Sequence, residues 1–256
     1  MPGYIALRNL SAQFALASTL FVASQSVFAG PPLVTDDPGV LGTGGWEYTL
    51  AVEGDKRDAG DGFVAPGLEV AYGFNDAMQG AVSIARAVVD EPGSSSRSDF
   101  DAIGFEFKWQ LYSDDNVAVA VAPAYSFPLT SSSTDRGIVE DVNVLSLPVI
   151  ASYETGPWAF NVQFAYEATS TGPNGKFAGL AGGYAVNDQL TLLAEVYTVR
   201  VSGEDADEDN WNLGVEYAVN DALALLASYG GSLSSALPSM EELDEAFFVG
   251  LIYVTD

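Results

Sequence analysis

The chain has 256 residues, with 35 Asp and Glu against 9 Lys and Arg, and it contains neither Cys nor His. The net charge of −26 argues against a nucleic-acid partner, because an acidic surface repels a phosphate backbone. The absence of Cys excludes disulfides and thiolate ligands, and the absence of His removes the commonest general base and transition-metal ligand. A Ser-based triad cannot be built in its usual form, so we expect no enzyme activity, no cofactor and no metal centre.

Residues 1–29 have the layout of a cleavable signal peptide. One basic residue, Arg8, precedes an apolar run over 10–23, and Val27-Phe28-Ala29 places small residues at the −3 and −1 positions of a cleavage site. The run is shorter than the roughly 20 residues that a membrane-anchoring helix needs. No later segment reaches that length either, so the mature chain can enter a membrane only as strands.

Residues 30–45 (GPPLVTDDPGVLGTGG) are rich in Pro and Gly and precede the first strand pattern. Two interpretations stay open. The segment is either a solvated periplasmic lead-in or a plug that folds into a barrel formed by the later strands, with Pro31, Pro32, Thr35, Asp36 and Asp37 as the plug residues.

Residues 46–256 contain segments of about 10 to 14 residues in which apolar and polar side chains alternate, as in tilted membrane strands. The clearest examples are 46–53, 103–111, 158–167 and 211–217. In the first of these, Trp46, Tyr48, Leu50 and Val52 form one face. Segments 77–89, 222–231 and 245–254 alternate less cleanly, and Arg86 falls on the apparently outward face, which a bulge or a position near a loop would explain.

Short turns and longer polar stretches alternate along this region. Five turn signals contain Asn, Asp or Gly, which suit tight hairpins: 75–76, 114–116, 155–157, 187–188 and 220–221. Six longer polar stretches lie between them, at 56–62, 90–98, 129–139, 170–175, 202–208 and 232–244. Eleven connections predict an all-β, single antiparallel transmembrane β-barrel of about twelve strands, with both termini in the periplasm. Aromatic residues near the short turns indicate an interfacial girdle on that side.

The polar parity of the strands predicts which residues line the lumen, the space inside the barrel. They are Glu69, Glu106, Lys108, Gln110, Asn161, Gln163, Glu167, Glu195 and Glu216. One interpretation is a narrow acidic passage in which Lys108 pairs with carboxylates, favouring cations or neutral solutes. The other is a polar network that fills the barrel without conducting.

The stretch 204–209 (EDADED) is the densest group of carboxylates. Clustered carboxylates suit Ca²⁺, but the spacing is not that of an EF-hand loop. The simpler interpretation is a solvated acidic surface loop, and we predict no metal site there.

The segment 30–51 resembles the start of an outer-membrane family described as meta-pathway phenol-degradation proteins or transporters. The resemblance rests on Pro31-Pro32-x-Val34-Thr35-Asp36-Asp37-Pro38 followed by Gly45-Trp46-Glu47. It implies passage or binding of small, aromatic or hydrophobic molecules. The chain departs from the common pattern of outer-membrane proteins by ending in Val254-Thr255-Asp256, which leaves Tyr253 as the nearest terminal aromatic assembly signal.

These observations predict a bacterial outer-membrane barrel that acts as a porin-like passive channel or transporter for small molecules. Its expected partners are outer-membrane lipids and lipopolysaccharide, a small-molecule solute and, during biogenesis, the barrel-assembly machinery. Two alternatives remain: a closed barrel with a structural or surface-interaction role, and a soluble secreted β protein.

Overall fold

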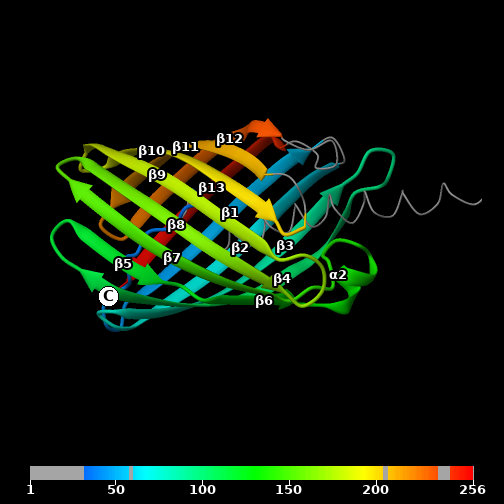
Figure 1. The fold of residues 1–256 in the computed structure, drawn as a ribbon, viewed down its shortest axis with the longest axis horizontal. Helices are drawn as coiled ribbons and strands as arrows, with labels where there is room; N and C mark the ends of the chain where they lie inside the picture. Colours follow the sequence, from blue (N-terminus) through cyan, green and yellow to red (C-terminus); the bar gives the residue numbers. More distant parts are fainter. Residues whose placement is uncertain (1–31, 58–59, 204–206, 236–242, 256) are drawn as a thin grey trace, which may run out of the picture.

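The computed structural model describes residues 32–57, 60–203, 207–235 and 243–255, which form one closed antiparallel β-barrel (Figure 1). The predicted signal peptide, together with Gly30 and Pro31, lies outside the described residues. Among the described residues, no helix combines the length and the apolar character needed to cross a membrane.

The barrel wall follows the chain order, and each strand pairs with its neighbours in sequence except β5 and β6, which both pair with β4 and β7. Its strands are β1 (Trp46–Arg57), β2 (Gly60–Asn75), β3 (Met78–Asp90), β4 (Arg97–Ser113), β5 (Val117–Val121), β6 (Ala124–Pro128), β7 (Val144–Thr155), β8 (Trp158–Thr169), β9 (Gly175–Asn187), β10 (Leu190–Val201), β11 (Asp207–Asn220), β12 (Leu223–Ser235) and β13 (Leu243–Thr255). The wall closes where β1 pairs antiparallel with β13, from Trp46 opposite Thr255 onward. Closure removes the free sheet edges that lipid could not hydrogen-bond.

The strands β5 and β6 together occupy one position in the wall. Both lie between β4 and β7, β5 beside 149–153 of β7 and β6 beside 144–146. The interruption falls at Ala122-Pro123, and Pro123 has no amide hydrogen for the ladder. The thirteen strand segments of the described chain therefore make a twelve-stranded barrel, which confirms the predicted fold class.

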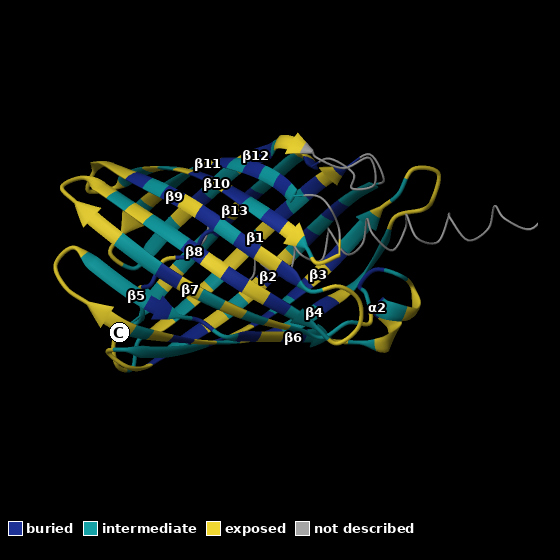
Figure 2. Ribbon diagram, in the orientation of Figure 1, coloured by how far each residue is buried: buried dark blue, intermediate teal, exposed yellow. Residues whose placement is uncertain are grey.

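Burial alternates along the strands with a period of two (Figure 2). In β1, the exposed residues are Trp46, Tyr48, Leu50 and Val52, while Glu53 and Asp55 on the other face are buried. The wall thus turns its apolar side chains outward, as a barrel in lipid requires and a soluble β protein does not. The outward faces predicted from the sequence are confirmed.

The five predicted short turns all lie at one end of the barrel, named here the turn end, and the opposite end is the loop end. The same device recurs in the turns: Asn75, Asn187 and Asn220 each accept a hydrogen bond at 2.9 Å from the main-chain N–H two residues on. Both β1 and β13 begin or end at the turn end, where Figure 1 marks the C-terminus.

The loop end departs from the prediction in two of its connections. Only two residues separate β1 from β2, so the stretch 56–62 is mostly strand and not a long loop. Similarly, β11 already begins at Asp207. The strands continue past the lipid-facing region with the same alternation, and polar composition alone does not reveal where pairing stops.

Two smaller features complete the wall. At the turn end, Trp46 packs on Tyr72 with ring centroids 4.7 Å apart and Trp158 on Tyr184 at 4.6 Å, which suits an interfacial aromatic girdle. Arg86 is exposed beside a register shift between β3 and β4 and donates to Ser98 Oγ at 2.9 Å, so a bulge near the loop end accommodates it.

Candidate functional site: the lumen and its N-terminal segment

The inner wall carries the predicted lumen residues. Lys108, Gln163, Glu167 and Glu195 are buried and the other five (Glu69, Glu106, Gln110, Asn161 and Glu216) are half-buried. All nine alternate with outward apolar neighbours. Most of the buried ones contact residues 32–45, which we name the lumenal segment.

The lumenal segment begins against β12 and β10. The carbonyl of Pro32 accepts a hydrogen bond from Ser228 Oγ at 2.7 Å. Two successive main-chain N–H groups, of Val34 and Thr35, donate to the two carboxylate oxygens of Glu195 at 2.7 and 2.8 Å. The same carboxylate accepts from Asn212 Nδ2 at 2.7 Å. One buried carboxylate therefore satisfies two main-chain donors that would otherwise be unpaired.

The segment then crosses to the opposite wall at Asp36. Its N–H donates to Gln163 Oε1 of β8 at 2.7 Å, while its carboxylate pairs with Lys108 Nζ of β4 at 2.7 Å. Lys108 also donates to the carbonyl of Asp37 at 3.1 Å. Since β4 and β8 lie on separate parts of the wall, Asp36 bridges the lumen. Lys108 thus pairs with a carboxylate of the segment, where the sequence suggested one of the wall.

From Pro38 onward the segment descends along β4, β3 and β2 to the turn end. Gln110 Nε2 donates to the carbonyl of Pro38 at 3.1 Å, and Leu41 N–H donates to Gln79 Oε1 at 2.8 Å. Thr43 Oγ1 donates to Asp76 in the β2–β3 turn at 2.8 Å, which helps to lower the pKa of that exposed carboxyl. Gly44 N–H donates to the carbonyl of Gly73 at 2.9 Å, and the chain enters β1.

Two glycines of the wall leave room for this path. A Cβ on Gly179 would lie 2.1 Å from Thr35 Oγ1, and one on Gly73 would lie 2.1 Å from the carbonyl oxygen of Gly42. Side chains at these positions would displace the segment. The sequence alone did not indicate a role for either glycine.

The structure does not bring all predicted residues together. Among the described contacts, Glu69, Glu106, Asn161 and Glu216 make no hydrogen bond to the lumenal segment, and Glu167 is 3.5 Å from Ser146 Oγ. Of the predicted plug residues, Pro31 lies outside the described residues, whereas Pro32, Thr35, Asp36 and Asp37 are inside the barrel.

A buried charge cluster in the loop-end half was missed. Arg57 at the end of β1 lies 3.3 Å from Asp55 and 3.2 Å from Glu208 of β11. All three side chains are inward and buried. The sequence contains a signal for this cluster, because Glu53, Asp55 and Arg57 continue the inward parity of β1. The polar composition of 56–62 instead predicts a loop.

An apolar patch interrupts the polar inner wall. Ala165, Phe177, Tyr197 and Val199 form a buried cluster across β8, β9 and β10, and Val34 of the lumenal segment packs against it. The rings of Phe177 and Tyr197 are 5.8 Å apart. The lumen therefore contains a buried aromatic patch, covered by Val34, beside the point where Glu195 holds the segment.

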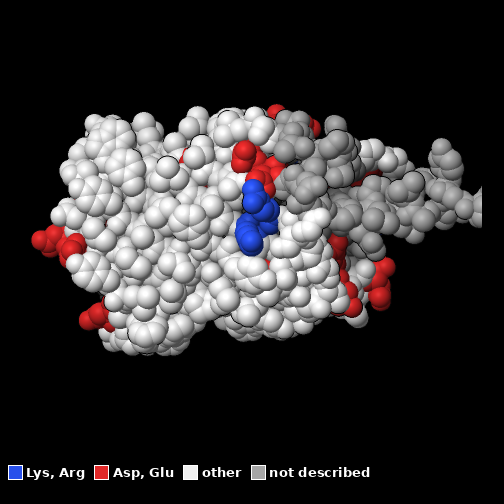
Figure 3. Space-filling view, in the orientation of Figure 1, with Lys and Arg blue, Asp and Glu red and all other residues white. Residues whose placement is uncertain are grey.

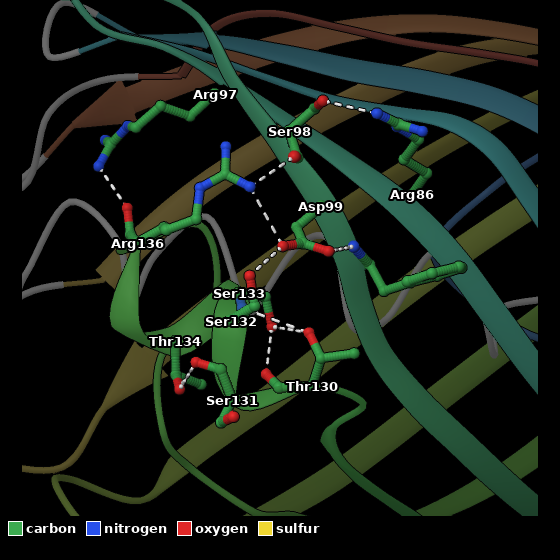
Figure 4. A network of polar contacts seen from close by, with 11 residues as sticks. Arg86, Arg97, Ser98, Asp99, Thr130, Ser131, Ser132, Ser133, Thr134 and Arg136 are labelled. Carbon is green, nitrogen blue, oxygen red and sulfur yellow. Dashed lines mark hydrogen bonds and ion pairs between the residues drawn. The ribbon is translucent and has the colours of Figure 1, made fainter.

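The connection after β6 folds over the loop end. It contains the short helix α2 (Ser131–Asp135), capped by Thr130, and continues into Ile138 and Val139, which pack on the inward residues Ala87 and Val89 of β3. Figure 4 shows its polar attachment to β4: Arg136 pairs with Asp99 at 3.2 Å, Ser132 Oγ donates to Asp99 at 2.7 Å, and Arg97 donates to the carbonyl of Arg136 at 2.6 Å.

No group of three or more potential metal ligands of the His, Cys, Asp or Glu type converges within the described residues. Of the acidic stretch 204–209, residues 204–206 lie outside them. Asp207 pairs with outward Arg200, whereas Glu208 points inward to Arg57, so these two carboxylates face opposite sides of β11.

Comparison with known proteins shows which family and which solved structures the barrel resembles. The profile of the Gram-negative porin family matches residues 37–236. The NanC porin structure has a TM-score of 0.56 at 10% identity over 82% of this chain and 100% of that chain, and the KdgM porin 0.54 at 11% over 80% and 98%. The β domain of the Bordetella autotransporter BrkA has a TM-score of 0.54 at 13% identity over 84% of this chain and 100% of that chain. These likenesses show a shared fold.

No curated protein matches the sequence. The resemblance to meta-pathway phenol-degradation proteins is not confirmed by these matches, which show the Gram-negative porin family. Because the porin profile covers most of the chain and the structure is a lipid-facing twelve-stranded barrel, the chain belongs to the Gram-negative porin family of outer-membrane proteins.

Proposed function

We propose that the chain is a passive, non-enzymatic channel for small molecules whose aperture is set by the lumenal segment. The observation that carries this proposal is the course of that segment, which crosses the lumen on hydrogen bonds from β12, β10, β8, β4, β3 and β2. A solute must pass between the segment and the wall, or displace the segment.

The lining favours neutral or cationic solutes with an apolar face. Carboxyl groups outnumber Lys108 among the predicted lumen residues, and in their ionised form they repel anions. The patch of Phe177, Tyr197 and Val199 lies under Val34 and would become an apolar contact surface for a solute that displaces the lumenal segment. This agrees with small aromatic or hydrophobic molecules, the class that the N-terminal motif suggested.

Single-channel conductance of the mature protein in planar bilayers tests the proposal, beside a variant lacking 32–41. That deletion retains Gly42 to Gly45, which pack on the turn end. We expect cation-selective steps that grow in the deletion variant. Glu216→Gln serves as the matched control, because Glu216 is a lumenal carboxylate without a hydrogen bond to the segment among the described contacts. Equal conductance with and without 32–41 would contradict a gating role.

A closed barrel with a surface role is the second candidate. It is favoured by the loop carrying Ile138 and Val139, which packs on inward residues of β3 at the end opposite the turns. Absence of conductance from a heat-modifiable barrel, even after deletion of 32–41, would select this candidate.

We further propose that the turn end faces the periplasm, with both chain ends there, and that the barrel-assembly machinery recognises β13 through Tyr253. Tyr253 is exposed on the outward face and its ring lies 6.5 Å from that of Tyr48. Tyr253→Ala should slow assembly more than Ile252→Ala, an inward neighbour, as followed by heat-modifiable migration in cells.

A further inference from the structure

The cations of the described chain are distributed unevenly. Of the nine Lys and Arg, eight are described, and six of these lie on the outward face or on connections near the loop end: Lys56, Arg86, Arg97, Arg136, Lys176 and Arg200. The other two, Arg57 and Lys108, face the lumen. At the turn end, by contrast, the exposed charges include Asp76, Asp114 and Glu154. The outward cations of this acidic protein therefore gather at one membrane interface, at the loop end.

Most of these six already have an acidic partner. Lys56 pairs with Glu245 at 2.7 Å, Arg97 with Glu91 at 2.6 Å and Arg136 with Asp99 at 3.2 Å. Arg86 donates to Ser98 Oγ and has no carboxylate partner among the described residues. Lys176 of β9 and Arg200 of β10 differ from the other cations because they are directly opposite each other in register. Arg200 also pairs with Asp207, its neighbour on β11, whereas Lys176 has no carboxylate partner among the described residues.

Two like charges directly opposite on neighbouring strands repel each other. Both side chains are exposed on the barrel wall. Figure 3 shows one compact patch of basic atoms, with acidic atoms beside it, on a face that is otherwise uncharged over most of its area. An anion lying between the ammonium and guanidinium groups would remove this repulsion. Phosphate fits, because Asp207 accepts from Nε and Nη2 of Arg200, which leaves further N–H groups of the guanidinium to donate to a phosphate while Lys176 adds a point charge.

The wall next to this pair is suited to acyl chains. Tyr166 on β8 is in register with Lys176, so an exposed aromatic ring lies beside the row formed by Lys176 and Arg200. Further toward the turn end on the same outward face lie Phe164, Leu180 and Val196, and the last two oppose each other directly. A charged row above an apolar surface is complementary to an amphiphile that has a phosphorylated headgroup and hydrocarbon tails.

We propose that Lys176 and Arg200 bind a phosphate group of a lipopolysaccharide molecule in the outer leaflet, whose acyl chains lie on Phe164, Leu180 and Val196. The site rests on the orientation proposed above, with the turn end in the periplasm, and would fix the loop end of the barrel in the lipopolysaccharide leaflet. It is independent of whether the lumen conducts, so a failed conductance experiment leaves it untouched.

The test is native mass spectrometry of the mature barrel in detergent micelles, titrated with bisphosphorylated lipid A. The variant K176Q/R200Q should bind lipid A more weakly, by roughly fivefold for each cation removed near an anionic surface. The single variant K176Q should show about half of this effect on a logarithmic scale, and it leaves the Arg200–Asp207 pair in place. The matched control is K56Q, which removes an equally exposed cation at the same end that is already paired with Glu245.

Two further arms identify the ligand. Lipid A without phosphate groups should bind the wild type and K176Q/R200Q with equal affinity. Millimolar inorganic phosphate should not displace bisphosphorylated lipid A from the wild type. Displacement would show a site for the free anion and would overturn the lipid assignment. Equal lipid A affinity for wild type and K176Q/R200Q, or an equal loss in K56Q, would overturn the proposed site.

Discussion

The two halves of the lumen are filled in different ways. Toward the turn end, a main-chain segment lies inside the barrel and is held by Glu195, Gln163 and Lys108. Toward the loop end, the wall's own side chains meet, as in the Arg57 cluster, and a folded connection brings Ile138 and Val139 onto β3. The first half depends on contacts with a removable segment, and the second on the strands themselves.

This difference indicates which contents of the barrel can rearrange without unfolding of the wall. The strands close through β1 and β13 independently of residues 32–45. Weakening an anchor in the turn-end half should therefore release the segment before the wall opens. The following predictions test that contrast, from the largest expected effect to the smallest.

Lys108→Met should have the largest effect. It leaves the buried carboxylate of Asp36 without its cation, and breaking a buried ion pair from one side costs about 3–5 kcal/mol. Urea unfolding in phospholipid vesicles, followed by Trp fluorescence, measures the loss, and protease cleavage within 32–45 shows whether the segment has been released. The double variant Asp36→Asn/Lys108→Met should recover most of the stability. A double variant as unstable as Lys108→Met would refute the ion-pair explanation.

Glu195→Gln should release the first part of the segment. Glutamine replaces one of the two accepting oxygens with an NH2 group, so the N–H of Val34 or of Thr35 loses its acceptor and about 1.5–3 kcal/mol of charged hydrogen bonding is lost. We expect faster proteolysis at 33–36 and larger conductance, with the unfolding midpoint of the wall nearly unchanged. Glu216→Gln is the control, and the same response in both variants would indicate a general charge effect.

Gly179→Ala tests the close approach of Thr35 to β9. The added methyl group would overlap the Thr35 hydroxyl, and overpacking of this kind costs about 1–3 kcal/mol. Gly182→Ala is the matched control on the same strand, since its Cβ would meet Phe160 at an ordinary 3.5 Å. Thermal unfolding of both variants should separate them, and a larger loss for Gly182→Ala would argue against the path of the segment.

Arg136→Gln should have the smallest effect, because it breaks a half-exposed ion pair with Asp99 and one exposed hydrogen bond to the carbonyl of Ser98 at the loop end. We expect an almost unchanged unfolding midpoint and unchanged proteolysis of 32–45, with faster hydrogen exchange confined to 130–139. Cleavage of the lumenal segment in this variant would show that the two halves are coupled, contrary to the comparison above.

The sequence determined much of the wall. Alternation in 46–53 and 158–167 assigns each side chain to lipid or lumen, because a strand has a period of two whatever it pairs with. The turns at Asn75, Asn187 and Asn220 could be predicted because each is stabilised by a contact two residues away. The inward parity of Glu195 and Gln163 follows from the same local rule.

Only the tertiary structure decided what these inward groups bind. Asp36 and Gln163 are 127 residues apart and Thr35 and Glu195 are 160 apart, so no local pattern links them. The sequence left 30–45 open between a lead-in and a plug, since a polar Pro-rich segment suits water and a polar lumen equally. Closure of β1 onto β13 brings Ser228, Glu195, Gln163 and Lys108 around one space, and their unpaired donors and acceptors select the path of the segment.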